Sequence, residues 1–575
     1  MYILGIVFGH NSTVALLKDG KIVRAVSEER FTRRKNEDAV PANSWKWVLE
    51  SEGITGEELD AVAVVSTENH SDYEKARGVA LGMPSAARSI WATIDYAHPI
   101  LRVIALPLVH FIRKRRSAAG RKAVKKILLK RLGVPESKIH FIDHHTCHAY
   151  AGYFGMTDGI EEALVLTLDG EGDGLCATVN IAREGRIRRI AATPLEASIG
   201  LVYAATTIYM GMKPLEHEYK LMGLAPYAKE YYKKTYERVF KPMIWLDENE
   251  LSFKSAFNTQ RSLFYLDEML KHERFDNIAA SVQRLTEDLL VRWVRAAVKK
   301  TGVRRVILSG GVFMNVKANM LISELPEVEE LYPLPSCGDE STPFGAVFYA
   351  YKELAGQDAP TTPLKDLYLG MEFGEKEIKE ALARLGKNYD VRRCKNIAKE
   401  IAGLLAEGEI VARCSGRMEW GARSLGNRAI LANPSTWETV RIINEQIKSR
   451  DFWMPFAPTL SAERADDYLI NPKKIPAPYM IMAFRSKPLA RKELVAAMHP
   501  ADFTLRPQIL ENWSNPDYYR ILEYFEKETG IGGVLNTSFN LHGEPMVCSP
   551  TDALYTMERS GLRHLVMGNI MVSKR

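Results

Sequence analysis

One pattern of strands and turns occurs twice in the first half of this chain, and it limits the folds that the chain can adopt. The first copy covers residues 2–17, where a polar loop at 9–13 separates two apolar strands. The second copy covers 163–181, with its polar loop at 169–174. Both loops carry glycine, and the first adds hydroxyl side chains, so each predicts a connection between antiparallel strands. A repeated unit of this kind predicts a domain built from two duplicated halves.

A third element completes the pattern. Residues 306–309 read as a buried strand, and a glycine pair follows them directly. Backbone amides and glycines let phosphate groups approach closely, although a glycine pair after a strand is by itself more often an ordinary turn. The three loops in this order predict an actin-like ATPase domain, of the sugar-kinase, heat-shock and actin superfamily. The candidate nucleotide-binding residues of this domain are Gly170, Gly172, Gly310, Gly311 and Asn315.

The length of the chain requires more than one hydrophobic core. A chain of 575 residues exceeds the usual size of a single domain. Residues 356–363 are polar and rich in proline, as a linker is. We therefore predict two domains, at 1–355 and 367–575, with a helical insert at about 70–130 in the first. The second domain begins with alternating helices and strands, so both domains are predicted to be α/β.

Composition narrows the function classes. Hydrophobic residues make up 46% and charged residues 26%, which is typical of globular proteins. The net charge of +6 is small for this length and suits anionic small substrates, whereas a nucleic-acid binder usually carries a basic stripe with interleaved aromatics. The six cysteines have no paired spacing, which argues against a disulfide framework or a zinc ribbon and favours the reducing cytoplasm.

One segment, at 90–112, is apolar enough to be compared with a membrane span. It contains Asp95, Pro99 and Pro107, and each central charge costs about 2.5–3.5 kcal/mol in a bilayer. We therefore predict an amphipathic insert and no spanning segment. The sequence leaves open whether this insert covers a cleft, makes an oligomer contact, such as a homodimer contact, or touches a membrane surface. Residues 1–8 read as a strand, with no export signal.

A pair of histidines has the spacing of metal ligands. His144 and His148 would lie on one face of a helix, one turn apart. Asp169 and Asp339 each follow an apolar run, where a strand would present its last side chain to a cleft. Two histidines and a carboxylate with open coordination positions are typical of non-haem iron. The alternative is a helix start whose histidines make only local hydrogen bonds.

The second domain carries a cluster of basic residues. Three arginines lie on a glycine-punctuated segment at 415–428, and two more cations are predicted on the helix that follows. The segment 533–540 adds amide and hydroxyl donors after a strand. Such a set suits several phosphate groups, although a solvated basic face would contain the same cations. The members of the cluster are Arg417, Arg423, Arg428, Lys448 and Arg450, with Ser538 and Asn540 as neutral donors.

Several motifs along the chain together resemble those of the O-carbamoyltransferase family of antibiotic and nodulation-factor biosynthesis. The principal ones are HHTCHA (144–149), YKLMGLAPY (219–227) and GRMEWGARSLG (416–426). Further matches are SEERFTR (27–33), PFAP (455–458), TLRPQ (504–508), NTSFN (536–540) and GEP (543–545). The resemblance covers nearly the whole chain except the insert at about 70–130, which departs from the short connection expected there.

The resemblance implies an enzyme with two sites. A C-terminal YrdC-like domain would convert carbamoyl phosphate and ATP, with Mg²⁺, into carbamoyl-adenylate. The N-terminal domain would hold Fe²⁺, or another divalent ion, and move the carbamoyl group to an acceptor hydroxyl. His10 would be the general base, because imidazole suits that task, and Lys35 would face the carbamoyl group. The implied metal ligands are His144, His148, Asp169 and Asp339, and Thr504 and Arg506 join the carbamoyl phosphate and ATP residues.

Three other functions remain open from the sequence. A sugar or acetate kinase could use the same N-terminal fold, but it needs no second basic domain. A nucleotide-gated interaction protein of the actin type would bind ATP without requiring carbamoyl phosphate. A threonylcarbamoyl-transferring tRNA enzyme is related, but the domain order and the weak basic character argue against it. The acceptor would be a small hydroxyl-bearing molecule, such as a sugar or a natural product, rather than a nucleic acid.

Overall fold

The computed structural model describes residues 1–67, 117–157, 161–448 and 450–575. Most of the helical insert expected at about 70–130 lies outside these residues, including the apolar segment 90–112. The end of the insert is a helix over 117–132. Among the described residues, no helix combines the length and the apolar character that crossing a membrane requires.

The first half of the N-terminal domain is a five-stranded sheet with the order β3-β2-β1-β4-β5. Strand β1 pairs antiparallel with β2 and parallel with β4, and β2 pairs antiparallel with β3. Every residue from Ile3 to Val7 is buried, because helices cover this sheet on both faces. The strands are β1 (Tyr2–Val7), β2 (Thr13–Lys18), β3 (Lys21–Ser27), β4 (Ala61–Val65) and β5 (Ile139–Ile142).

The second half repeats this arrangement in the order β12-β11-β6-β7-β8. Strand β6 pairs antiparallel with β7 and parallel with β11, as β1 does with β2 and β4. The strands are β6 (Ala163–Gly172), β7 (Leu175–Arg183), β8 (Arg186–Pro194), β11 (Arg305–Ser309) and β12 (Glu330–Pro333). The same strand order in both halves confirms the expected duplication and the actin-like fold class.

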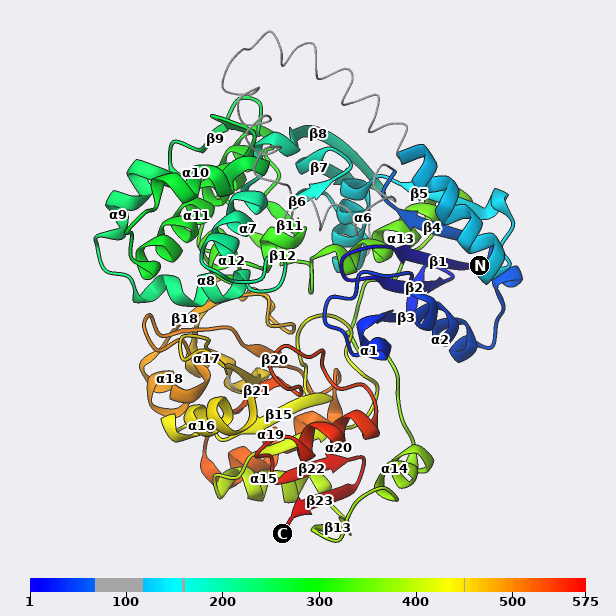
Figure 1. The fold of residues 1–575 in the computed structure, drawn as a ribbon, viewed down its shortest axis with the longest axis vertical. Helices are drawn as coiled ribbons and strands as arrows, with labels where there is room; N and C mark the ends of the chain where they lie inside the picture. Colours follow the sequence, from blue (N-terminus) through cyan, green and yellow to red (C-terminus); the bar gives the residue numbers. More distant parts are fainter. Residues whose placement is uncertain (68–116, 158–160, 449) are drawn as a thin grey trace.

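Two helices lie between the sheets and join the halves. Helix α13 (Thr342–Ala355) packs on β1 and β4, and α6 (His144–Met156) packs on β6 and β11. The helices touch each other at Gly345, where an added Cβ would lie 1.7 Å from the Cys147 carbonyl oxygen. A side chain at this position would push the helices apart. The two lobes therefore meet along α6 and α13 in the upper part of the molecule (Figure 1).

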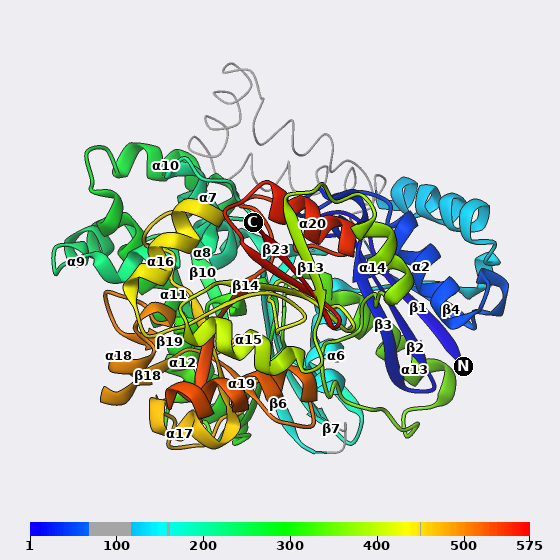
Figure 2. The ribbon, with the colours of Figure 1, turned by 90° about the horizontal axis from the view of Figure 1, so that it is seen from below.

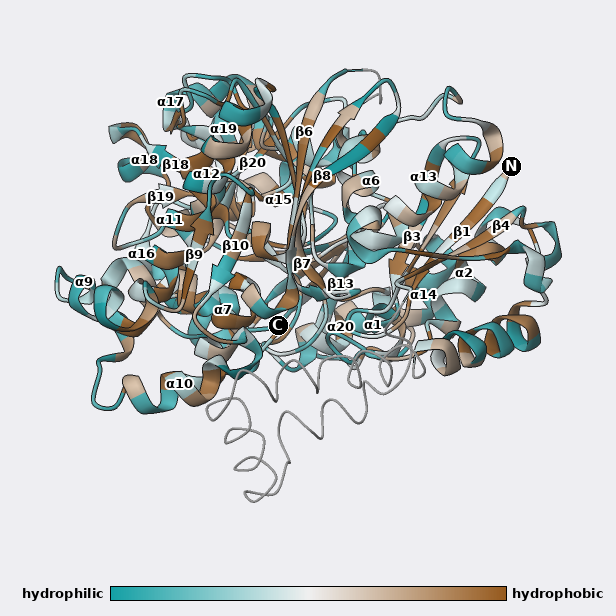
Figure 3. Ribbon diagram, turned by 90° about the horizontal axis from the view of Figure 1, so that it is seen from above, coloured by the Kyte–Doolittle hydropathy of each residue, from teal (hydrophilic) through white to brown (hydrophobic). Residues whose placement is uncertain are grey.

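A helical layer extends the second lobe. Its longest helix, α11, buries Trp293, whose indole N–H donates to the carbonyl of Leu251 at 2.9 Å. The remaining elements of the second lobe are α7 (Ile199–Tyr209), α8 (Glu218–Leu224), α9 (Tyr232–Thr235), β9 (Ile244–Asp247), β10 (Ser252–Ser255), α10 (Ser262–Met269), α11 (Phe275–Thr301) and α12 (Val316–Ser323). The first lobe also contains α1 (Glu29–Thr32) and α2 (Ala42–Glu52). Hydrophobic residues gather along the strands and on the inner faces of the helices (Figure 3).

The C-terminal domain is built on a mixed sheet with the order β13-β23-β22-β14-β15-β21-β16-β20. The alternation of its strands explains its two helical layers, because Leu431 points into one hydrophobic cluster and Ile430 into another. The strands are β13 (Tyr389–Arg393), β14 (Val411–Cys414), β15 (Arg428–Ala432), β16 (Ala457–Ser461), β20 (Gln508–Leu510), β21 (Gly533–Ser538), β22 (His564–Met567) and β23 (Ile570–Lys574). This is the second α/β part that the sequence predicts.

Helices α15 (Ile397–Ala406) and α19 (Pro516–Thr529) share the cluster of Leu431, and α14 (Glu375–Leu382) and α20 (Pro550–Glu558) share that of Ile430. The remaining elements are α16 (Trp437–Ile442), α17 (Ala465–Tyr468), β17 (Leu469–Ile470), β18 (Phe484–Ser486), α18 (Pro488–Glu493) and β19 (Thr504–Leu505). Seen from below, the C-terminal domain lies across both lobes of the N-terminal domain (Figure 2).

Candidate functional site

The local sequence of α6 places its two histidines at the beginning of the helix. Asp143 is the N-cap, and its carboxylate accepts the N–H of Thr146 at 2.8 Å. Asp173, from the loop after β6, accepts the N–H of His144 at 2.9 Å. These two carboxylates fix the first turn, so that His144 and His148 project from the same side of the helix.

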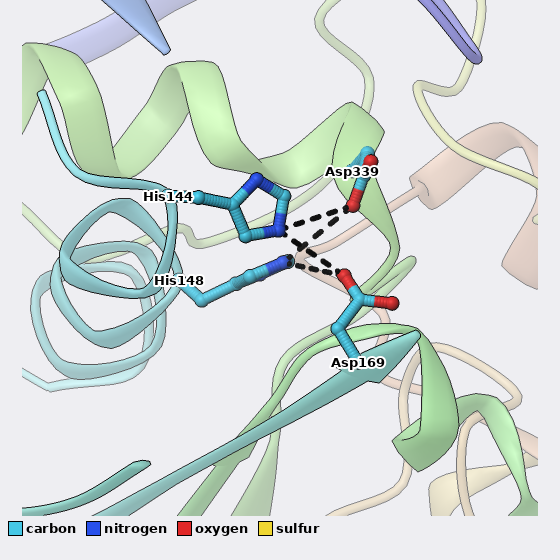
Figure 4. Close-up of side chains that lie close together, drawn as sticks. All are labelled: His144, His148, Asp169 and Asp339. Atoms are coloured by element: carbon cyan, nitrogen blue, oxygen red, sulfur yellow. Dashed lines mark hydrogen bonds and ion pairs between the residues drawn. The ribbon is translucent and has the colours of Figure 1, made fainter. Parts of the chain in front are cut away.

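The four expected metal ligands converge at one point (Figure 4). Asp169 Oδ2 lies 3.3 Å from His144 Nε2 and 3.0 Å from His148 Nε2. Asp339 Oδ1 lies 3.5 Å and 3.7 Å from the same nitrogens. One ligand atom from each of the four side chains lies within 4.8 Å of the others. The strand end and the turn that carry Asp169 and Asp339 thus bring two carboxylates against the imidazole pair.

The histidines and aspartates of this cluster attract each other electrostatically, which shifts the pKa of His144 and that of Asp169. Burial alone would lower the pKa of His144, but Asp339 and Asp169 outweigh it and raise the pKa to about 9. Burial would raise the pKa of Asp169, but its hydrogen bonds to His144 and His148 hold the pKa well below the usual value. A divalent cation would take the place of these protons, since two imidazole nitrogens and two carboxylates are a normal donor set for one. The residues present therefore fit a divalent metal ion.

The glycines predicted to bind a nucleotide surround this cluster. An added Cβ at Gly172 would lie 2.1 Å from the His144 ring, and one at Gly311 would lie 3.0 Å from Asp169 Oδ1. Gly310 has φ of +104°. These positions need glycine so that the two loops can approach the ligands. Asn315 caps α12, accepting the N–H of Ala318 at 3.1 Å.

The two predicted catalytic residues lie on the first lobe, on the side of the domain interface. His10 follows β1, and its Nε2 is buried without a hydrogen-bond partner among the described residues. Burial raises the pKa of two nearby carboxyl groups, those of Glu218 and Glu340. The Lys35 ammonium lies 3.2 Å from a carboxylate oxygen of Glu216.

A cavity of about 240 Å³ lies between the two domains. The N-terminal domain contributes one wall, which includes Asn11, next to His10, and Lys35. The C-terminal domain contributes the segment after β14 and the end of β21. Predicted residues that line this cavity are Lys35, Arg423, Lys448, Arg450, Thr504, Arg506, Ser538 and Asn540.

Several cations of this cavity lack acidic partners. Arg423, Arg450 and Arg506 form no ion pair with a carboxylate in the part of the chain that the structure describes. Burial lowers the pKa of Arg450 to about 10 and holds that of Arg506 well below its usual value. Three partly buried guanidinium groups without counter-charges carry a desolvation cost that an anion bound among them would offset.

Lys448 is held by neutral oxygens alone. Its ammonium donates to Asn540 Oδ1 at 2.7 Å, to Ser538 Oγ at 3.1 Å and to the Ser538 carbonyl. Burial, with Arg450 and Lys35 nearby, holds its pKa well below the usual value. The expected helix ends at Lys448, so Arg450 lies beyond it rather than on it.

Comparison with known proteins agrees with this geometry. The family described as "Carbamoyltransferase N-terminus" matches residues 2–348, and "Carbamoyltransferase C-terminus" matches 402–574. An uncharacterized protein of Methanocaldococcus jannaschii is 30% identical, over 100% of this chain and 99% of its own length. Nodulation protein NolNO of Sinorhizobium fredii is 28% identical, over 99% of this chain and 79% of its own length. A 3'-hydroxymethylcephem-O-carbamoyltransferase of Amycolatopsis lactamdurans is 28% identical, over 46% of this chain and 47% of its own length.

The chain belongs to the carbamoyltransferase family. The resemblance inferred from the motifs is thereby confirmed, and the chain is an enzyme, a carbamoyltransferase. The two family matches fall on the two α/β parts of the fold, with the interface cavity between them.

Two predicted arginines of the carbamoyltransferase do not line the cavity. Arg428 is buried in β15 and donates to backbone carbonyls, including that of Cys548 at 3.0 Å. Arg417 donates to the carbonyl of Val23 at 3.2 Å, on the first lobe. Arg428 therefore stabilises the backbone of its own domain, and Arg417 stabilises the contact with the first lobe. Their predicted contact with carbamoyl phosphate or ATP stays a prediction.

Other cavity residues of the carbamoyltransferase were not singled out from the sequence. Lys317, on α12, forms an ion pair with Asp502 and donates to Thr504 Oγ1 at 3.2 Å. The ring N–H of His499 donates to the Gly223 carbonyl at 2.7 Å across the domains. Only Gly223 and Thr504 lie in matched motifs; Lys317, Asp502 and His499 carry no signal of their own in the sequence.

Proposed function

We propose that this carbamoyltransferase forms carbamoyl-adenylate in the interface cavity and transfers the carbamoyl group to a hydroxyl at the histidine and aspartate cluster. The observation that carries the proposal is a set of cations, the buried Lys448 and the partly buried Arg423, Arg450 and Arg506, which face one cavity and form no ion pair with a carboxylate in the described part of the chain. Such a set suits carbamoyl phosphate and the phosphates of ATP with its Mg²⁺ better than any uncharged ligand.

In the first step, water releases phosphate from carbamoyl phosphate and leaves carbamate. A carbamate oxygen then attacks the α-phosphorus of ATP, and pyrophosphate leaves as carbamoyl-adenylate forms. The guanidinium groups of Arg423, Arg450 and Arg506 stabilise negative charge as the phosphates leave. Lys448, oriented by Ser538 and Asn540, places a further positive charge at the same point. The domain wall excludes water that would hydrolyse the mixed anhydride.

In the second step, the acceptor hydroxyl attacks the carbamoyl carbon, and AMP leaves. His10 takes the proton of the hydroxyl at Nε2, which has no other partner among the described residues. Lys35, on the cavity wall of the same lobe, faces the carbamoyl group. A divalent metal, Fe²⁺ in our proposal, bound by His144, His148, Asp169 and Asp339 would supply Lewis-acid polarisation. We propose a small hydroxyl-bearing molecule, such as a sugar or a natural product, as the acceptor, because one relative is named for carbamoyl transfer to a hydroxymethylcephem.

The two half-reactions can be separated by substitution. Lys448→Met removes a cation from the first site, so release of pyrophosphate from ATP and carbamoyl phosphate should fall by at least about a hundredfold. His10→Asn leaves that site intact, and pyrophosphate release should continue while transfer stops. The measurements are a pyrophosphate assay and transfer of radiolabelled carbamoyl groups to a panel of glycosides.

The same experiment can reject the proposal. Equal loss of both half-reactions in the His10→Asn variant would exclude two separate sites. Pyrophosphate release that does not depend on carbamoyl phosphate would identify a different ATP-consuming reaction. Arg464→Met is the control, because Arg464 is a C-terminal arginine that pairs with Asp467 and Glu526 away from the cavity, and both activities should survive it.

A further inference from the structure

One peptide group of the C-terminal domain is held from both sides by the N-terminal domain. The carbonyl of Gly421 accepts a hydrogen bond from the Arg30 guanidinium at 2.9 Å. The N–H of Ala422, on the same peptide unit, donates to Ser336 Oγ at 3.0 Å. Arg30 belongs to the first lobe and Ser336 to the second. The next residue in the chain is Arg423, which faces the interface cavity.

The two residues that hold this peptide, here called the two arms of the contact, are Arg30 and Ser336, and each is itself held by a buried carboxylate. Arg30 pairs with Glu29 at 3.0 Å, and Glu29 in turn accepts the N–H of Asn36 at 2.7 Å. Arg30 and Glu29 are each only 6% exposed, so neither is a solvated surface group. A guanidinium that is shared between a carboxylate and one carbonyl has little freedom to move.

The second arm is equally constrained. The hydroxyl of Ser336 donates to Glu340 at 2.5 Å, which leaves its lone pairs for the N–H of Ala422. An added Cβ at Gly421 would lie 2.7 Å from the Cβ of Ser336, and Gly421 has φ of +99°. The approach of the two loops therefore requires glycine at this position.

The loop that carries Ser336 also reaches the other site. The carbonyl of Cys337 accepts the N–H of Gly310 at 3.0 Å, and Asp339 belongs to the histidine and aspartate cluster. One short loop thus contacts the Arg423 segment, the glycine pair and the metal ligands. None of these contacts belongs to the chemistry proposed above.

We propose that Arg30 and Ser336 are positioning residues that clamp the Gly421–Ala422 peptide and so aim Arg423 at the anion in the cavity. The inference rests on the proposed function for the identity of the anion. It goes further in assigning part of the C-terminal site to residues of the N-terminal domain. The affinity of the cavity for phosphate compounds then depends on both lobes.

The test measures pyrophosphate binding to the full chain by titration calorimetry. Ser336→Gly removes the hydroxyl together with its CH2 group, and the φ of +48° at this residue suits glycine. We expect about tenfold weaker binding and an about tenfold higher KM for carbamoyl phosphate, with little change in kcat or melting temperature, because a displaced arginine binds less well. Arg30→Lys should have a similar effect.

A double variant and a control separate positioning from general damage. When both arms are changed, the loss should be less than the product of the single effects, since one broken arm already frees the peptide. Arg485→Met breaks a different interdomain pair, with Glu324 at 2.7 Å, and should leave the affinity unchanged.

Wild-type affinity in the Ser336→Gly and Arg30→Lys variants would overturn the clamp, as would a wild-type chain that binds no pyrophosphate. A wild-type chain that binds pyrophosphate but releases none from ATP and carbamoyl phosphate would reject the proposed function alone. In that case, the pyrophosphate affinities of the Ser336→Gly and Arg30→Lys variants would still decide whether these residues position the peptide.

Discussion

Among single residues, Lys448 has the most unusual electrostatic position. Its ammonium is buried and surrounded by Arg450, Lys35 and neutral oxygens, so its pKa is held well below 10.5. An anion in the cavity would favour the charged form. Binding and protonation of Lys448 are therefore linked.

The linkage predicts how anion binding changes with pH. Below the lowered pKa, Lys448 is already charged, and the affinity for pyrophosphate should not depend on this group. Between that pKa and 10.5, binding must take up a proton, so the affinity should fall as pH rises, by up to about tenfold per pH unit. Calorimetry in two buffers of different ionisation enthalpy would measure the uptake.

Lys448→Arg is the matched variant for this prediction. A guanidinium keeps its proton throughout the range, so the pH dependence due to residue 448 should disappear. An unchanged pH profile in this variant would assign the dependence to another group and contradict the linkage.

Among the elements, the end of β6 brings Gly172 against the histidine and aspartate cluster that would hold the metal. At Gly172 an added Cβ would overlap the His144 ring, whereas at Gly170 it would meet no atom within 4 Å. The two glycines are two residues apart on the same strand end. They therefore form a matched pair for testing whether the end of β6 sets the position of His144 in the cluster.

Gly172→Ala should displace His144 and lower bound iron or cobalt to a small fraction of one equivalent. Overpacking of this kind costs about 1–3 kcal/mol, so the chain should still fold, with a lower melting temperature. Gly170→Ala should keep the metal content of the wild type. Metal analysis after loading and dialysis measures the metal content of both variants. Equal metal content in the two would refute the role of the end of β6 in positioning His144.

The elements also show what the sequence could predict. The duplicated strands and the histidine pair on one face of α6 follow from local patterns, apolar alternation and one helical turn, and the structure has them where they were expected, whereas the role of these histidines as metal ligands stays a prediction. The positions of the three arginines of 415–428 do not follow from local patterns, because residues 415–427 form neither helix nor strand and have no periodicity, and only Arg428 begins a strand. Arg423 faces the cavity, Arg428 supports backbone carbonyls and Arg417 contacts the first lobe.

The cavity could not be predicted from local sequence patterns either. Its walls come from segments separated by hundreds of residues, and Arg30 meets Gly421 across a separation of 391. No pattern within either segment encodes that contact. The family motifs marked both segments as important, but only the folded chain shows that they share one hydrogen bond.

For the whole molecule, the domain interface is the feature that relates the two proposed half-reactions. Ion pairs and buried hydrogen bonds join the domains around the cavity, including Lys220 with Asp451 at 3.0 Å and His499 with Gly223. Asn11, beside His10, lies in the same cavity wall as Lys35. Carbamoyl-adenylate made in this cavity would reach His10 without entering bulk water, if the proposed function holds.

Mixing two inactive variants tests this internal transfer. The His10→Asn chain should make carbamoyl-adenylate but not use it, and the Lys448→Met chain should do the reverse. Because the intermediate would be held between the domains of one molecule and hydrolysed outside it, the mixture should show less than about a hundredth of wild-type transfer. Recovery of transfer in proportion to the concentration of the Lys448→Met chain would mean that the intermediate diffuses through solvent. Synthetic carbamoyl-adenylate added to that chain is the control, because transfer from it would demonstrate an intact second site.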